Sequence, residues 1–186
     1  MASTINATTS SGIVATADNT GSLALQSAGT TVATINSTGV NAGIQMAANT
    51  APAFSAYQSS TQTPAATTWT KVQFQTEEFD TNNNFDSTTN YRFTPTVAGY
   101  YQLTSLVNIG ANYSGAIAIY KNGSNYKQGI SFASAGTTFQ SWLATSLVYF
   151  NGSTDYAEIY LYITSSQATV ATSYQTWFNG FLARSA

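Results

Sequence analysis

The sequence predicts an all-β protein built from antiparallel strands. From Tyr101 to Ile109 every second residue, Ser105 excepted, is large and apolar, which is the pattern of a strand with one buried face. Clusters of Asn, Ser and Gly, such as Thr81–Asn84, separate this run from other short apolar runs and predict turns between strands. No stretch shows the 3.6-residue period of an amphipathic helix, so we expect essentially no helix.

Composition excludes several classes of function. Only 6% of the residues are charged, against about 25% in an average globular protein, and five bases are too few for a basic nucleic-acid-binding face. The absence of cysteine and histidine excludes disulfides and the Ser-His-Asp and Cys-His triads. No run approaches the ~18 apolar residues of a membrane span, and no signal peptide is visible. We therefore expect a non-enzymatic protein of the virion surface, assembled in the host cytoplasm, because uncharged, hydroxyl-rich β-chains are typical of fibres and virions.

Residues 1–50 differ from the rest of the chain because they contain no aromatic residue. Short apolar runs at 13–15, 23–25 and 32–35, followed by Val40 and Ile44, alternate with glycine-containing turns and predict a weak β-repeat. One copy would bury little apolar surface. Two interpretations stay open: the segment is disordered, or three copies wrap into a β-stalk that anchors the protein to other virion proteins.

Residues 51–186 form a second predicted domain, the head. Its first strand is expected at 54–57, entered through Pro52. Further strands are expected near 70–75, 90–95, 100–109, 115–121, 137–150, 155–164 and 174–183.

Three motifs in the head carry a family resemblance. The first runs at fixed separations through Phe74, Asp80, Phe85, Phe93, Gly99, Tyr101 and Leu103. The others are Tyr120–Gly123 (Tyr-Lys-Asn-Gly) and Phe178–Leu182 (Phe-Asn-Gly-Phe-Leu). In this order they resemble the globular head of complement component 1q, a jelly roll shared with the tumour-necrosis-factor family. One extra residue before Phe93, Leu103 in place of Phe, and Ser105 in place of an aromatic residue depart from the family pattern.

This resemblance implies an antiparallel jelly-roll sandwich that assembles as a threefold homotrimer. The sequences of residues 21–26 and 29–35 resemble segments of tailed-phage fibre proteins. This resemblance supports a β-stalk on the N-terminal side of the head.

The strand expected at 155–164 is apolar on both faces, which suggests that one face meets another subunit. Ala157, Ile159, Leu161 and Ile163 alternate with Tyr156, Glu158, Tyr160 and Tyr162. A sandwich strand needs one apolar face for the core, and a second one dense in tyrosine favours an interface. We therefore predict the trimer interface at Tyr156, Glu158, Tyr160 and Tyr162, where Glu158 would need a cation or a hydrogen-bond partner.

Candidate ligand residues lie in predicted loops. The densest acidic cluster of the sequence consists of Glu77, Glu78, Asp80 and Asp86. It is either a solvated loop or a weak calcium site. No other cofactor is expected. A second set of loop residues consists of Asn82, Asn83, Tyr113 and Tyr126. These residues either contact the host surface, through a glycan or a protein, or have no binding role.

Together these observations predict a structural protein of a tailed bacteriophage: a trimeric surface fibre or spike with an adhesive head. The alternative is a capsid decoration protein that stabilises the shell. A glycan-cleaving enzyme with two paired carboxylates is the remote third hypothesis.

Overall fold

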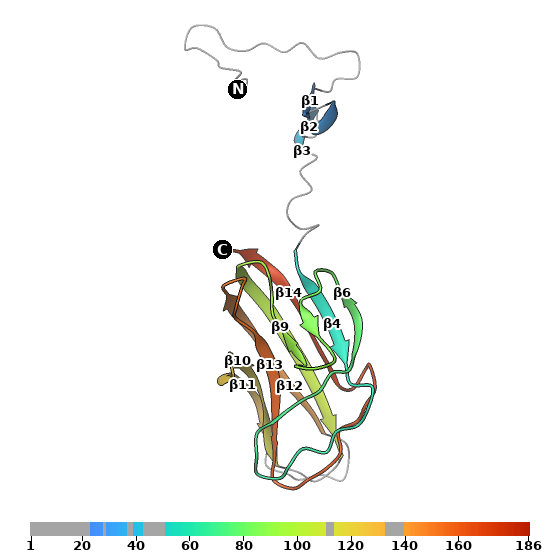
Figure 1. Ribbon diagram of the computed structural model, residues 1–186, viewed down its shortest axis with the longest axis vertical. Coiled ribbons are helices and arrows are strands. Elements are labelled where there is room, and N and C mark those ends of the chain that lie inside the picture. The colour runs from blue at the N-terminus through green and yellow to red at the C-terminus, as the bar shows by residue number, and fades with distance from the viewer. Residues whose placement is uncertain (1–22, 28, 37–38, 43–50, 111–113, 133–139) are drawn as a thin grey trace. The chain divides into compact units, whose positions relative to one another are not determined.

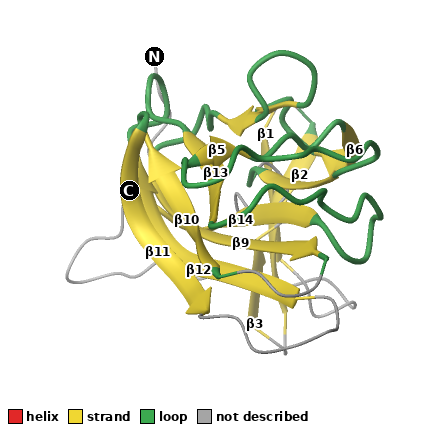
Figure 2. Cartoon of the chain, turned by 90° about the horizontal axis from the view of Figure 1, so that it is seen from below, coloured by secondary structure: helices red, strands yellow, loops and turns green. Residues whose placement is uncertain are grey.

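The computed structural model describes residues 23–27, 29–36, 39–42, 51–110, 114–132 and 140–186. The chain divides into two compact units, Met1–Asn49 and Thr50–Ala186. All regular structure in the described residues is β-strand, and Figure 2 shows only strands and loops there, so the prediction of an all-β chain is confirmed. Accordingly, no helix in the described ranges is long and apolar enough to cross a bilayer.

The first unit contains a three-stranded antiparallel sheet of β1 (Leu23–Ser27), β2 (Thr30–Asn36) and β3 (Gly39–Ala42), in that order. The predicted runs at 23–25 and 32–35, and Val40, lie in these strands. The run at 13–15 and Ile44 lie outside the described residues. Wrapping of three copies into a stalk stays a prediction.

The second unit, the head, is a sandwich of two antiparallel sheets (Figure 1). The first sheet has the order β12 (Gln140–Phe150), β9 (Gly99–Ile109), β14 (Trp177–Ser185), β4 (Ala53–Tyr57), β6 (Thr76–Asp80). The second has the order β11 (Ser124–Phe132), β10 (Gly115–Lys121), β13 (Ala157–Ile163), β8 (Arg92–Phe93), β7 (Phe85–Asp86), and β5 (Thr70–Lys71) also pairs with β13.

Most of the predicted strands are confirmed, and the errors concern short or edge strands. A strand was expected at 70–75, but only Thr70 and Lys71 form one, the short strand β5. The prediction is therefore wrong for residues 72–75. Strands β6, β7 and β11 were not predicted. Strand β7 has only two residues. Strands β6 and β11 lie at sheet edges, where the outer face and one side of the backbone meet solvent, so polar side chains hide the alternation on which strand prediction depends.

The core lies between the sheets and is rich in aromatic rings. Phe54 of β4 stacks on Phe93 at 4.3 Å and on Phe85 at 5.1 Å, and meets Phe178 edge-on at 4.9 Å, all between ring centroids. Each such ring contributes about 2–3 kcal/mol when fully buried. Aromatic residues of the first motif and Phe178 of the third therefore meet in one cluster, although 93 positions separate Phe85 from Phe178.

Non-aromatic motif residues also have specific structural roles. Asp80 accepts hydrogen bonds from the backbone N–H of Phe85 (2.6 Å) and of Asn82 (3.2 Å), and so closes the turn between β6 and β7. A Cβ on Gly180 would lie 2.5 Å from Leu103 Cδ2 and 2.9 Å from Phe54 Cε1, so no side chain fits there. These two motif residues are thus explained by a turn and by the packing of the core.

The second motif, Tyr120–Gly123, forms the turn of a β-hairpin. Strands β10 and β11 pair across a two-residue turn in which Asn122 and Gly123 have φ of 52° and 77°. Positive φ at both central residues is the requirement of a type I′ turn, which favours Asn-Gly.

Candidate interaction surfaces

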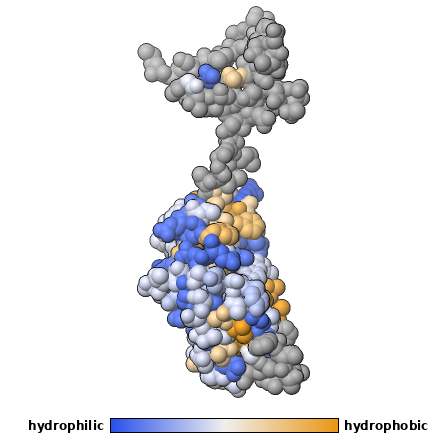
Figure 3. All heavy atoms as spheres, turned by 90° about the vertical axis from the view of Figure 1, so that its right-hand side faces the viewer, coloured by the Kyte–Doolittle hydropathy of each residue, from blue (hydrophilic) through white to orange (hydrophobic). Residues whose placement is uncertain are grey.

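The outward side chains of the first sheet form a surface that we call the open face. Along β9 and β12 every second residue enters the core, so the residues between them point outward. Five large apolar residues of this face are 41–53% exposed: Phe79, Tyr100, Leu147, Tyr149 and Phe181. They are five of the eight large hydrophobic residues that are exposed in the described part of the chain. Seen from the side of β4 and β6, hydrophobic areas interrupt a mostly hydrophilic head surface (Figure 3).

The register aligns the outward residues of the open face into rows across the strands. From β12 through β9 to β14 the rows are Tyr149–Tyr100–Arg184, Leu147–Gln102–Phe181, Thr145–Thr104–Asn179 and Leu143–Leu106–Trp177. Within the more polar rows, Thr145 Oγ1 lies 2.8 Å from Gln102 Nε2 and 3.1 Å from Thr104 Oγ1. Because these polar groups are partly satisfied by one another, covering the face would leave few unpaired donors.

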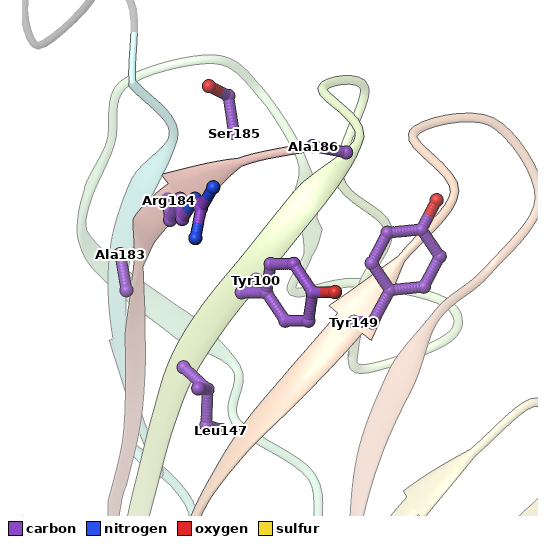
Figure 4. A pocket seen from close by; sticks show the side chains of 7 residues that line it. All are labelled: Tyr100, Leu147, Tyr149, Ala183, Arg184, Ser185 and Ala186. Carbon is purple, nitrogen blue, oxygen red and sulfur yellow. The ribbon is translucent and has the colours of Figure 1, made fainter.

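One end of the open face is hollowed. Figure 4 shows Arg184 of β14, Tyr100 of β9 and Tyr149 of β12 in a row at the edge of this hollow, which has a volume of about 630 Å³. The two tyrosine rings lie 5.4 Å apart between centroids. Among the described residues Arg184 makes no ion pair.

Three of the four residues predicted at the trimer interface are tyrosines, and they lie on the outer face of the second sheet. We call Trp69, Tyr120, Tyr160 and Tyr162 the aromatic cluster. Tyr160 stacks on Tyr120 at 3.9 Å, and Trp69 lies 6.0 Å from Tyr120 and 5.7 Å from Tyr162. Burial raises the pKa of Tyr160 and of Tyr120 above the ordinary value. These rings therefore cover one another within a single chain.

Tyr156 and Glu158 are also covered within the chain. The guanidinium of Arg92 lies 4.3 Å from the centre of the Tyr156 ring. Glu158 is 3% exposed and forms a 2.7 Å ion pair with Lys71, whose ammonium also donates to the Asn90 carbonyl at 3.1 Å. Within a single chain, Trp69 and Arg92 therefore cover part of the tyrosine rings, and Lys71 neutralises Glu158. An interface at Tyr156, Glu158, Tyr160 and Tyr162 stays a prediction.

The acidic residues proposed for calcium do not form a loop cluster. Glu77, Glu78 and Asp80 lie on edge strand β6, so their interpretation as a solvated loop is wrong. Glu78 accepts a hydrogen bond from Ser55 Oγ at 2.7 Å, and Glu77 accepts one from Ser87 Oγ at 2.6 Å. Among the described residues no three carboxylates come close enough to hold a metal ion.

Asp86, the fourth calcium candidate, organises the turn after β7. Its carboxylate accepts the backbone N–H groups of Thr89 (2.9 Å), Thr88 (3.0 Å) and Asn90 (3.1 Å). These hydrogen bonds, that of Thr89 above all, hold the pKa of Asp86 well below its usual range. The carboxylate is thus occupied by its own chain.

The predicted loop contacts lie on separate elements. Asn82 and Asn83 lie in the turn between β6 and β7, where Asn83 has φ of 52°. Tyr126 is exposed on strand β11, not in a loop, and the Lys127 ammonium lies 5.4 Å from its ring centre. Tyr113 lies outside the described residues.

The open face as a whole was missed by sequence reasoning. Its rows combine residues 100–106, 143–149 and 177–184, and only strand pairing brings these together.

No protein-family model and no curated protein matches the sequence. Solved structures do resemble the head. The globular domain of a zebrafish complement 1qA protein has a TM-score of 0.57 at 16% identity over 73% of this chain and 99% of that chain. Murine APRIL has a TM-score of 0.54 at 9% identity over 71% and 98%. The tumour-necrosis-factor protein Eiger from S. frugiperda has 0.52 at 8% identity over 73% and 93%. At such identities the likeness shows the fold: the head is a complement-1q- and tumour-necrosis-factor-like jelly roll.

Proposed function

We propose that three copies of this chain assemble through the open face into a structural homotrimer. The observation that carries the proposal is the gathering of Phe79, Tyr100, Leu147, Tyr149 and Phe181 on one sheet of a fold whose resemblance to complement component 1q already implies a trimer. Exposed apolar patches of this kind mark protein–protein contacts. A stable interface buries about 800 Å² per partner, and the face of five long strands supplies residues for such an area.

The interface we favour is thus not the outer face of β13. There the aromatic cluster is half-covered and Glu158 is neutralised by Lys71, so a monomer already shields much of that surface. The open face has no comparable cover in the described chain.

We further propose that the trimer is a short fibre or spike of a tailed bacteriophage, with the head outward and adhesive to the host surface, and with residues 1–50 as stalk and anchor in the particle. The support is compositional: 6% charged residues, no cysteine, and a glycine-punctuated β-repeat ahead of the head. The role is non-enzymatic, because the acids of β6 and Asp86 are engaged in hydrogen bonds that shape the sheet edge and a turn.

Two measurements test these proposals. Light scattering of the purified protein is expected to give about three times the 19.7 kDa chain mass, and a monodisperse species of one chain mass refutes the trimer. Immuno-electron microscopy of intact particles is expected to label the tail. Label spread over the capsid shell would instead favour the decoration protein, and absence from the particle would refute a virion role.

A further inference from the structure

A second hollow, of about 360 Å³, lies on the outer side of the second sheet, beside the aromatic cluster. Its lining includes Trp69, Tyr162, Gln128, Thr164, Ser114 and the small residue Ala116. Its volume is at the lower end of the ~300–1,000 Å³ of small-ligand sites. The hollow exists because Ala116 stands opposite Tyr162 in the β10–β13 ladder, so a small side chain adjoins a large one.

The aromatic walls of this hollow are held in place by packing. Trp69 and Tyr162 lie 5.7 Å apart with their planes at 49°. Trp69 also contacts Tyr120, which stacks on Tyr160. Directly after Trp69, strand β5 pairs with β13 at Thr70 and Leu161, which fixes the backbone of the tryptophan. The indole is therefore presented in one position and loses little freedom when a ligand stacks on it.

The polar groups of the hollow are uncharged. Thr164 Oγ1 donates to the Ser114 carbonyl at 3.1 Å, so its lone pairs face outward as acceptors. The exposed Gln128 carboxamide and the Trp69 indole N–H make no hydrogen bond within the described chain. None of the described residues that line the hollow is charged. On the adjoining strands β5 and β13, Lys71 and Glu158 are paired with each other.

We propose that this hollow binds one neutral pyranose residue of a glycan. The apolar C–H face of the sugar ring stacks on Trp69, with Tyr162 as the second wall. The hydroxyl groups, each both donor and acceptor, meet Gln128 and Thr164. The absence of a charged lining group disfavours a cationic or anionic ligand. The proposal deepens the adhesive role proposed above and rests on it, but the trimer contact through the open face is separate from this site.

The three tryptophans allow a direct test, because they report on three places. Trp69 lines the hollow, Trp142 is fully buried in the core, and Trp177 lies on the open face. The full chain, labelled with 5-fluorotryptophan, is titrated with the methyl glycosides of glucose, galactose, mannose and N-acetylglucosamine and followed by fluorine NMR. At least one glycoside is expected to shift the Trp69 signal saturably in the millimolar range, while the Trp142 and Trp177 signals stay in place.

Variants locate the contact. Gln128→Ala is expected to weaken the binding about tenfold, because one hydrogen bond is lost. Tyr174→Ala removes an exposed aromatic residue of a turn that does not line the hollow, and is expected to leave the binding unchanged. Trp69→Ala abolishes binding as read by saturation transfer to the glycoside, with the Trp142 signal showing that the head is folded.

The proposal is overturned if no glycoside of the panel moves the Trp69 signal, or if Gln128→Ala and Trp69→Ala bind like wild type. Light scattering of the same sample separates the two proposals: a trimer without glycoside binding refutes the site alone, and a monomer refutes the assembly.

Discussion

At the scale of single residues, carboxylates and glycines determine the turns and the closest packing. Asp80, Asp86 and Asp155 each accept backbone N–H groups at the ends of strands. Hydrogen bonds to the ionised form hold the pKa of Asp86 and of Asp155 below the ordinary value; for Asp155 the Asn122 side chain is the main cause. The free energy of unfolding is therefore expected to fall at acid pH, where Asp86 and Asp155 become protonated.

Asp86→Asn tests this dependence. Since the folded pKa of Asp86 is lowered, its contribution is complete above the unfolded value of about 3.9 and is lost as pH falls towards the folded value. We expect the variant to be less stable than wild type by about 1 kcal/mol at pH 7, and the difference to shrink as pH falls from 4 towards 2. Denaturant unfolding across this pH range measures it. A difference independent of pH would show that the carboxylate charge does not matter.

Gly180→Ala tests the close approach in the third motif. The added methyl group would lie 2.5 Å from Leu103 Cδ2, so we expect a loss of about 1–3 kcal/mol in unfolding free energy. In a Leu103→Ala background the methyl group meets less of the core, and the penalty of Gly180→Ala should shrink. Equal penalties in both backgrounds would mean that Leu103 is not the obstacle.

At the scale of elements, the β10–β11 hairpin is tied to the start of β13 by one asparagine. Asn122 Nδ2 donates to Asp155 Oδ1 at 2.7 Å, and Asn122 Oδ1 accepts the Tyr156 N–H at 2.9 Å. Asp155 also pairs with Lys121 at 2.9 Å. Asn122 therefore both tolerates the positive φ of the turn and joins it to a neighbouring strand.

Two substitutions separate these roles of Asn122. Asn122→Gly keeps the backbone freedom but loses both side-chain hydrogen bonds, and is expected to cost about 1–2 kcal/mol. Asn122→Ala also strains the left-handed backbone, which adds about 1 kcal/mol. Chemical denaturation compares the unfolding free energies of the two variants. If the alanine variant is as stable as the glycine variant, the left-handed backbone at position 122 carries no strain cost.

At the scale of the whole molecule, the two outer faces of the head differ. The open face exposes five large apolar side chains, whereas the outer face of the second sheet covers its own rings with Trp69, Lys71 and Arg92. The first arrangement suits a contact between subunits, and the second suits a small ligand.

Leu147→Asp and Tyr160→Asp distinguish these assignments. A carboxylate at Leu147, which is 52% exposed, would be desolvated in an interface through the open face, so the variant is expected to be a folded monomer by light scattering. Tyr160→Asp is expected to stay a trimer, as is the control Tyr174→Asp in an exposed turn. If instead Tyr160→Asp dissociates the trimer and Leu147→Asp leaves it intact, the interface lies on β13.

The sequence by itself determined the features that depend on local alternation and on close packing. Period two over residues 101–109 predicted strand β9. The spacing of Phe74, Phe85 and Phe93 carried the resemblance that implied the jelly roll, and it is specific because these rings are buried in the core, where few residue types fit. The open face, the ion pair of Lys71 with Glu158, and the hollow beside Trp69 were decided by tertiary structure alone. Each joins residues far apart in the chain, 87 positions in the case of the ion pair, and surface positions tolerate so many side chains that their pairing leaves no periodic signal.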